Sequence, residues 1–205
     1  MEEDPYVYPG MEVLRNRFDE ADPARLAVLE YAATRGRSAE RLAFPLTGDG
    51  YRATHRHLFQ DVFEWADELR TTDLARPGTQ FARPAFIEPA LRDRFRQVAA
   101  TGELAGMDAL IFAAEAAHHM AELNAIHRFR EGNGRTMRFH LEQIAHQAGH
   151  SIDLADIEAR DWIGASIASF RGDELPVASA IGRAMGMDEH QLGRLRDAQQ
   201  NGHGR

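Results

Sequence analysis

One short segment holds most of the residues that could do chemistry in this chain. Residues 127–138 read His-Arg-Phe-Arg-Glu-Gly-Asn-Gly-Arg-Thr-Met-Arg. His127 supplies an imidazole, a group whose ordinary pKa of about 6.5 suits a general base at neutral pH. Glu131 is the only acid in the segment, and Mg²⁺ is typically held by one or two carboxylates together with substrate phosphates. The segment therefore predicts a site that combines a base with a metal ligand.

The second half of the segment has the composition of an anion-binding turn. Gly132 and Gly134 flank Asn133, and glycines let a backbone bring its N–H groups close to a ligand. A helix that starts here would direct its free N–H groups and its positive dipole end at the same point. Arg135 and Arg138 are three residues apart, so they share one face of that helix and could grip one phosphate chain. We expect a phosphate cradle at this turn.

The segment is also locally basic in an acidic protein. The chain has a net charge of −8, whereas Arg128 and Arg130 add to the two later arginines around a single acid. A basic island of this kind favours a small polyanionic substrate, and we include Arg130 among the candidate phosphate ligands. Phe129 is predicted to turn inward and anchor the loop to the core.

Each feature has an ordinary structural explanation when it is taken alone. Gly-Asn-Gly is a common turn, a lone histidine is more often structural than catalytic, and two arginines on a helix usually form a solvated face. Their occurrence together favours a functional site, because every residue serves one reaction geometry.

The segment resembles the signature of the Fic family, His-x-Phe-x-(Asp/Glu)-Gly-Asn-Gly-Arg-x-x-Arg. Every fixed position is matched, by His127, Phe129, Glu131, Gly132, Asn133, Gly134, Arg135 and Arg138. The resemblance implies an enzyme that transfers AMP from ATP to a Ser, Thr or Tyr hydroxyl of a target protein and releases pyrophosphate.

The same resemblance implies a role for each matched residue. His127 would take the proton from the target hydroxyl, and Glu131 would hold Mg²⁺. The Gly132–Gly134 turn would bind phosphates as an anion hole, while Arg135 and Arg138 would grip the distal phosphates.

Two other classes of function stay open at this point. One is a different transfer on the same scaffold, such as phosphorylation or the transfer of UMP or phosphocholine. Kinase-like relatives carry lysine at the position of Gly134, so the glycine here favours AMP transfer. The other is a non-enzymatic domain that binds phosphate groups or a phosphoprotein.

The rest of the chain predicts an all-α protein, a helical bundle with one small β-hairpin as in the Fic fold. Apolar spacing and helix start signals place helices at 23–40, 52–70, 88–100, 154–170 and 174–187. One further helix is expected on each side of the motif. The 205 residues are enough for one domain. We expect a domain over 1–187 and a polar tail over 188–205 that frays.

The segment 71–87 has short β-prone pieces around a Pro-Gly turn, which predicts a hairpin. In Fic enzymes the matching hairpin, the flap, covers the nucleotide and pairs its edge with the target protein. Pairing with a strand edge fixes the register of a docked peptide. Gly78, Thr79, Gln80 and Phe81 are the candidate nucleotide contacts on this flap.

Composition limits the location and the partners. No stretch approaches the roughly 18–20 apolar residues of a membrane span, and the acidic balance argues against direct nucleic-acid binding. The N-terminus lacks an apolar signal region, so we expect a cytoplasmic protein, with delivery into another cell by a secretion system as a further possibility.

Regulation is predicted from a missing pattern. Many Fic proteins are restrained by a helix with Ser/Thr-x-x-x-Glu-(Gly/Asn), whose glutamate pairs with the second motif arginine, here Arg138. This pattern is not convincingly present; Ser169, for example, is followed at the fourth position by Asp173. We therefore expect a toxin or effector, and favour a separate small antitoxin that supplies the glutamate to Arg138.

Overall fold

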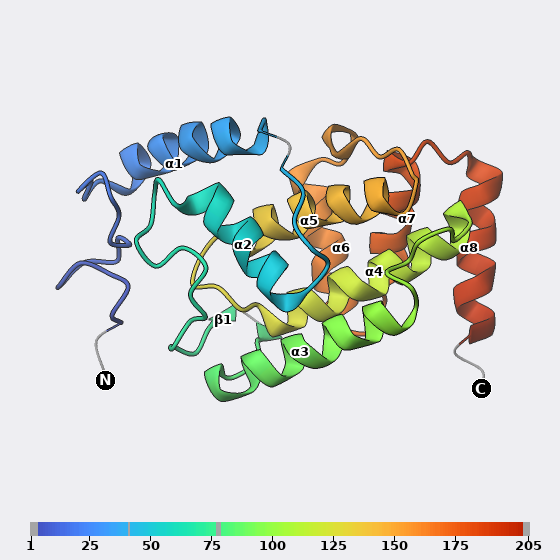
Figure 1. Ribbon diagram of the computed structural model, residues 1–205, viewed down its shortest axis with the longest axis horizontal. Helices are drawn as coiled ribbons and strands as arrows, with labels where there is room; N and C mark the ends of the chain where they lie inside the picture. The colour runs from blue at the N-terminus through green and yellow to red at the C-terminus, as the bar shows by residue number, and fades with distance from the viewer. Residues whose placement is uncertain (1–3, 41, 77–78, 203–205) are drawn as a thin grey trace.

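The computed structural model describes residues 4–40, 42–76 and 79–202, and it is almost entirely helical (Figure 1). The elements in chain order are α1 (Pro23–Ser38), α2 (Gly48–Phe59), β1 (Ala75–Arg76), β2 (Thr79–Gln80), α3 (Pro84–Ala100), α4 (Ala109–Ile126), α5 (Asn133–Gln147), the 3₁₀ turn η1 (Leu154–Asp156), α6 (Ala159–Phe170), α7 (Leu175–Ala184) and α8 (Glu189–Gly202). The predicted all-α class with one small hairpin is confirmed.

Helix α4 is the central element of the bundle. It begins at the N-cap Asp108, whose carboxylate accepts from the N–H groups of Leu110 and Ile111. It packs against α3, α5, α6, α7 and α8. A core helix with neighbours on most sides must be apolar around most of its circumference, and the buried residues of α4 meet this need. They are Phe112, Ala113, Ala116, Ala117, His119, Met120, Ala121, Leu123 and Ile126.

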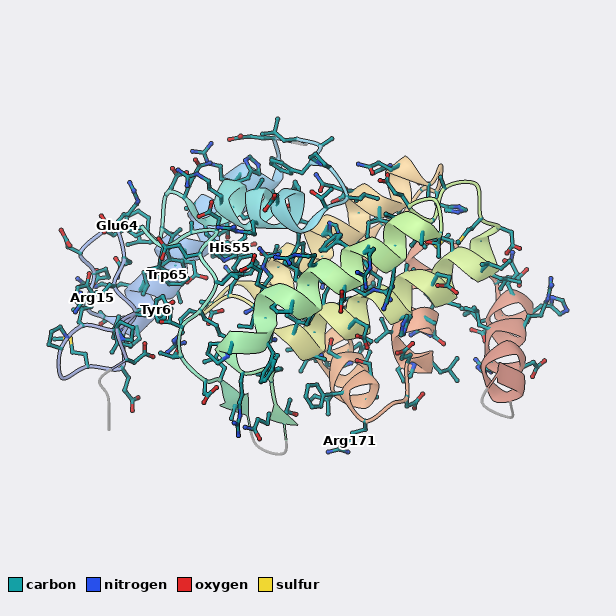
Figure 2. All side chains as sticks on the ribbon, turned by 60° about the horizontal axis from the view of Figure 1, so that its bottom comes forward. Tyr6, Arg15, His55, Glu64, Trp65 and Arg171 are labelled. Atoms are coloured by element: carbon teal, nitrogen blue, oxygen red, sulfur yellow. The ribbon has the colours of Figure 1, made fainter. Side chains whose placement is uncertain are left out.

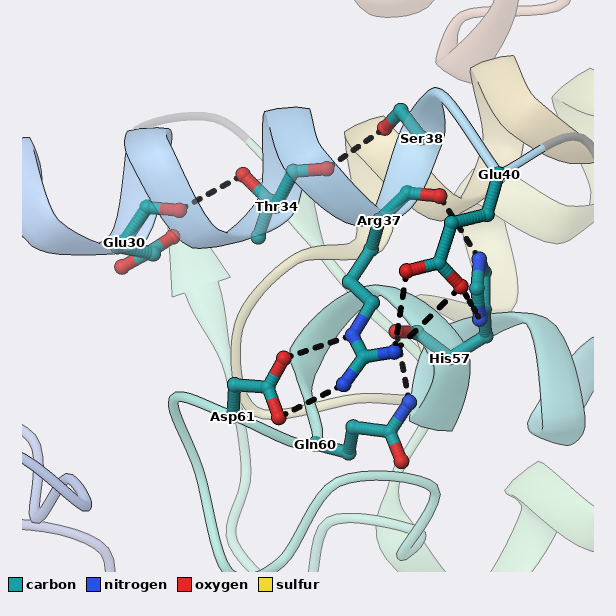
Figure 3. A network of polar contacts seen from close by, with 8 residues as sticks. All are labelled: Glu30, Thr34, Arg37, Ser38, Glu40, His57, Gln60 and Asp61. Carbon is teal, nitrogen blue, oxygen red and sulfur yellow. Dashed lines mark hydrogen bonds and ion pairs between the residues drawn. The ribbon is translucent and has the colours of Figure 1, made fainter.

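Helix α1 lies at the periphery, near the N-terminal end of the molecule (Figure 1). It buries only Leu26 and Thr34 and rests against α2. Its last turn is tied to the segment after α2 by a two-pronged ion pair from Arg37 to Asp61, at 2.7 and 2.9 Å (Figure 3). The N-terminal arm is held by Tyr6, whose ring meets that of Trp65 edge to face at 5.3 Å (Figure 2).

Helix α2 is shorter than predicted. We expected a helix over 52–70, but it ends at Phe59, and residues 60–70 form turns. The apolar side chains that suggested helical spacing are still buried, because the turn folds them into a second small core. His55 secures this turn, since its Nδ1 accepts a 2.9 Å bond from the N–H of Asp67, a residue in a left-handed conformation with φ 79°.

The hairpin is also shorter than predicted. β1 and β2 pair antiparallel, with Ala75 opposite Gln80, but residues 84–87 belong to α3 instead of the flap. Pro84 explains the early start, because its fixed φ suits the first turn of a helix. The Pro77-Gly78 turn itself lies outside the described residues.

The C-terminal region departs from the prediction at two points. The helix expected over 154–170 is divided into η1 and α6. The segment expected to fray forms α8, which buries Leu192 and Leu195 against the rest of the core. Two leucines three residues apart lie on one helix face, which is enough to dock an otherwise polar helix. Among the described residues, no helix has the length and apolar character needed to cross a membrane.

Candidate active site

The motif forms the loop between α4 and α5 and the first turn of α5. His127 ends α4 in a left-handed conformation (φ 45°), and Gly132 precedes α5 with φ 80°. Two left-handed residues reverse the chain within this short loop. The loop therefore presents the imidazole and the start of α5 on one side of the bundle.

Asn133 closes the loop with its side chain. Its Oδ1 accepts from the N–H of Phe129 at 2.9 Å, and its Nδ2 donates to the carbonyl of Phe129 at 2.7 Å. Both side chains are buried, Phe129 completely. Phe129 is thus placed as the predicted anchor, and the amide of Asn133 shapes the turn while its backbone is left to meet a ligand.

The two glycines of the motif have different surroundings. A Cβ on Gly132 would lie 2.4 Å from Cζ of Phe59, and its positive φ also disfavours other residues. A Cβ on Gly134 would meet no atom within 4 Å. The fold therefore requires glycine at 132, whereas Gly134 faces open space at the start of α5, where a ligand would approach.

The start of α5 has the free N–H groups of a helix N-terminus. The first intrahelical bonds run back to Gly132, from the N–H of Thr136 at 3.0 Å. The N–H groups before Thr136 have no intrahelical acceptor by helix geometry, and the helix dipole is positive there. The N–H of Gly132 is held by the Glu131 carboxylate at 2.9 Å. The remaining first-turn N–H groups can bind phosphate oxygens.

The two motif arginines start from this turn but have different partners. Arg135 forms an ion pair with Glu30 of α1, and its Nη1 is 3.5 Å from the Thr34 hydroxyl. Arg138 donates to the backbone carbonyls of Leu154 and Ile157. Burial lowers the pKa of Arg138. The predicted shared grip is therefore not formed in this structure, in which each guanidinium is held from a different side.

The other two arginines of the motif turn away from the cradle. Arg128 is buried, donates to the carbonyl of Gly48 at 3.3 Å and stacks its guanidinium over the rings of Tyr51 and Phe129. Burial lowers its pKa to about 9. Arg130 pairs with Asp4 of the N-terminal arm at 2.8 Å. The structure does not gather the four arginines into one island, because Arg128 is buried against aromatic rings and Arg130 pairs with the N-terminal arm.

His127 lies between the flap and the end of α4. Its ring stacks on that of Phe81, with centroids 3.8 Å apart and planes 15° apart. Its backbone carbonyl accepts a 2.7 Å bond from Nε of the buried Arg70. The residue as a whole stays partly exposed, and the stack limits the rotation of its ring.

Glu131 is placed where a metal ligand would be useful. Its side chain is 42% exposed and its carboxylate lies 4.0 Å from Arg135. A single accessible carboxylate at a helix N-terminus fits Mg²⁺, which usually takes its other ligands from phosphates and water.

His55 fixes the backbone at Glu131. It is fully buried and lies near the middle of Figure 2. Because its Nδ1 accepts from Asp67, its Nε2 carries the proton and donates to the Glu131 carbonyl at 3.1 Å. Its ring stacks on Phe129 at 3.6 Å. Burial lowers the pKa of His55 to about 3, so the ring is neutral.

The flap residues predicted as nucleotide contacts differ in their exposure and in their contacts. Thr79 is half-buried and Gln80 exposed on β2. Phe81 is buried, and its contact is with His127. Gly78 lies outside the described residues. The structure thus gives Phe81 a partner within the protein that the sequence did not suggest.

Three residues of the site were missed by the sequence analysis: Glu30, His55 and Arg70. None lies in the motif, and two of them, His55 and Arg70, act on backbone carbonyls, which a sequence pattern does not display. Two further histidines outside the motif, His119 and His140, are buried, and their Nε2 atoms lie 3.1 Å apart. No metal-binding group of three acidic or histidine side chains occurs in the part of the chain that the structure describes.

Two hollows elsewhere do not compete with this loop as candidate sites. One of about 440 Å³ lies between the start of α2 and α3, and one of about 310 Å³ lies between the end of α1 and α5. Neither is lined by a residue of the motif.

Known proteins resemble this chain in sequence and in fold. A family model described as "Fic/DOC family" matches residues 45–145. A probable protein adenylyltransferase of Sinorhizobium fredii, y4lH, is 40% identical over 186 residues, which are 88% of this chain and 95% of that protein. A probable protein adenylyltransferase of Escherichia coli is 34% identical over 172 residues, covering 83% of this chain and 86% of that protein.

Among solved structures, the BepC protein of Bartonella tribocorum, a VirB-translocated effector with bound AMPPNP, superposes with a TM-score of 0.83. It is 25% identical, with 89% of this chain and 96% of that chain covered. A Fic domain from Bartonella quintana with bound ADP gives a TM-score of 0.82 at 25% identity, with 91% and 97% covered.

Proposed function

The chain belongs to the Fic/DOC family and is a protein adenylyltransferase, and we propose that it transfers AMP from ATP to a Ser, Thr or Tyr hydroxyl of a target protein. The observation that carries the proposal is the position of His127 beside the N-terminus of α5. A base and an anion-binding helix end are thereby presented by one short loop.

The chemistry assigned to His127 is removal of the proton from the target hydroxyl. The hydroxyl oxygen then attacks the α-phosphorus of ATP, a new P–O bond forms, and the bond to pyrophosphate breaks. The stack on Phe81 holds the imidazole in place, and the partial exposure of His127 admits the target side chain. A positioned base of this kind typically contributes about 10²–10⁴-fold to the rate.

The start of α5 binds the phosphates in this proposal. Backbone N–H groups at Gly134 and Arg135 donate to phosphate oxygens, and Arg135 and Arg138 neutralise the distal phosphates. Glu131 holds Mg²⁺, which would offset charge on the leaving pyrophosphate. To reach a phosphate fully, Arg135 must share or release Glu30, and its 41% exposed side chain leaves room for this change.

The target protein docks on the exposed edge of the flap, where backbone pairing fixes its register. A second partner is a small antitoxin that supplies a glutamate to Arg138. Within the described residues Arg138 has only neutral carbonyl partners, so a carboxylate from another chain would find an uncompensated cation there. The protein acts in the cytoplasm of its own cell, or of a cell into which it is delivered.

The position of the transferred label tests the reaction. The purified chain is incubated with Mg²⁺ and a bacterial lysate, and with ATP labelled either at the α- or at the γ-phosphate. Transfer of the α-label to protein supports the proposal. Transfer of the γ-label alone would show phosphorylation, and would overturn it.

The regulatory part has its own test. Expression of the chain alone should be toxic, and co-expression of a neighbouring small open reading frame should relieve the toxicity. The antitoxin proposal is wrong if no adjacent gene encodes a helix with the inhibitory pattern and the purified chain is inactive alone.

A further inference from the structure

Arg70 joins the flap to the catalytic loop. It lies between α2 and β1, and its side chain is among the most deeply buried in the protein, at 1% exposure. Its Nε donates to the carbonyl of His127 at 2.7 Å, and its Nη1 donates to that of Thr72 at 2.7 Å. Its Nη2 donates to the carbonyls of Ala82 and Ile126. One guanidinium therefore binds both ends of the flap and the end of α4.

Arginine is the side chain best suited to this junction. Its guanidinium carries five N–H donors in a fixed plane, and four carbonyls from three separate segments converge on it. Burial lowers the pKa of Arg70, which shows that the site is an unfavourable place for a cation. The carbonyls at the end of α4 carry the negative end of the helix dipole and partly offset this cost.

The flap makes two further contacts with the same end of α4. The N–H of Ala82 donates to the carbonyl of Ala125 at 3.2 Å, and Phe81 stacks on the imidazole of His127. The ring of Phe81 also meets Phe170 of α6 edge to face at 5.8 Å. The position of the flap and the position of the imidazole are thus set by one connected group of contacts.

We propose that Arg70 is a positioning residue for the transfer reaction, which holds the flap in fixed register with the imidazole of His127. This inference rests on the proposed function, in which the target peptide pairs with the flap edge and its hydroxyl must meet His127. Arg70 touches neither the target nor the phosphate cradle. It acts by fixing the distance between the surface that docks the peptide and the base that deprotonates it.

A second buried arginine provides a matched control. Arg94 of α3 is 6% exposed and donates to Nδ1 of His119 at 2.9 Å and to Gln97 at 3.1 Å. Burial lowers its pKa as well. None of these bonds reaches the flap or the catalytic loop. Arg94→Met therefore removes a buried arginine but leaves the contacts of Arg70 with the flap and the loop in place.

The first test needs no activity. Hydrogen exchange and the NMR shift of the His127 ring protons are compared in the wild type, Arg70→Met and Arg94→Met. In the wild type the stack on Phe81 should shift these protons upfield. Arg70→Met should lose this shift and exchange faster over residues 71–83 and 125–129, whereas Arg94→Met should keep both properties. Equal changes in the two variants would overturn the proposal.

The second test measures transfer of labelled AMP to the acceptor protein. Arg70→Met should lower kcat by about 10²-fold, the effect expected from a displacement of about 1 Å, with little change in KM for ATP. If that variant does not fold, Arg70→Lys replaces it, because lysine keeps the charge but has fewer donors. Arg70→Lys should exchange faster than both the wild type and Arg94→Met over the same residues, and it should lose more kcat than Arg94→Met. A wild type without transfer activity defeats the proposed function alone, because the exchange and NMR results stand apart from it.

Discussion

The two ends of the catalytic loop are held by different kinds of contact. At the His127 end, Arg70 and Phe81 bind the loop from inside the protein, through a fully buried guanidinium and a ring stack. At the other end, Arg135 is held by Glu30 on a peripheral helix, and its side chain is 41% exposed. A ligand cannot displace the first set of contacts, but a phosphate can compete with the second. The structure thus fixes His127 and lets Arg135 change its partner, which in the proposed reaction separates a fixed base from an adjustable phosphate ligand.

The largest effect should come from the fixed end. His127→Ala removes the base and should reduce transfer by about 10²–10⁴-fold. Binding of ATP should be nearly unchanged, because the phosphate ligands lie at the other end of the loop. Transfer of labelled AMP and calorimetric titration of ATP measure the two effects.

His118→Ala is the control for this substitution. His118 is also on α4, but it is 45% exposed and pairs with Glu174 at 3.0 Å, away from the loop. The His118→Ala variant should leave both the transfer of AMP and the binding of ATP unchanged. Near-normal transfer by His127→Ala would remove that residue from its assigned role.

The two glycines of the motif should respond in opposite ways to the same added methyl group. Gly132→Ala forces a Cβ to 2.4 Å from the Phe59 ring at φ 80°. Backbone strain of about 1–3 kcal/mol and overpacking of about 1–3 kcal/mol should both lower the free energy of unfolding. Gly134→Ala meets no atom within 4 Å, so it should be neutral or stabilise by up to about 1 kcal/mol.

Urea unfolding measures the stability of these two variants, and ATP titration separates structure from function. Gly134→Ala should bind ATP more weakly in spite of its stability, since the methyl group enters the cradle. If it binds ATP like the wild type, then phosphates do not approach α5 at this residue.

Acid should lower the free energy of unfolding, because His55, His119 and His140 are buried in the folded protein. Burial lowers the pKa of both His55 and His140 to about 3 and lowers that of His119. In the unfolded chain each would titrate near 6.5, so below that pH the unfolded state binds more protons than the folded state. Their contribution to stability is complete above about pH 6.5, and decreases as the pH falls toward about 3.

Urea unfolding between pH 7 and 4.5 measures this loss. Each histidine that stays neutral in the folded state should contribute up to about 1.4 kcal/mol per pH unit. A free energy of unfolding that is flat over this range would show that these rings are charged or accessible in the folded protein.

The sequence predicted the motif far better than the structure around it. Eight matched positions were enough to predict a loop between two helices with Phe129 as its buried anchor, because they lie in one local segment. The base and the phosphate turn stay predictions. The end of α2 at Phe59 could not be predicted from apolar spacing, since the side chains that follow are buried equally well by a turn. Arg70 and His55 escaped notice because their partners are backbone carbonyls of distant segments. The pairing of Arg130 with Asp4 could not be foreseen, because that acid lies in the N-terminal arm, far away in the sequence.

The smallest effect should come from the adjustable end. Glu30→Gln removes the negative charge that faces Arg135, and should tighten ATP binding by about fivefold, or ~1 kcal/mol, as for other partly exposed ion pairs. Burial raises the pKa of Glu30, so a neutral amide should fit there without loss of stability. Asp61→Asn is the matched control, because it breaks the ion pair that ties the end of α1 to the rest of the protein but leaves Arg135 untouched (Figure 3). If Glu30→Gln weakens ATP binding while Asp61→Asn does not, Glu30 aims Arg135 at the phosphates instead of competing with them, and the division into fixed and adjustable ends is wrong.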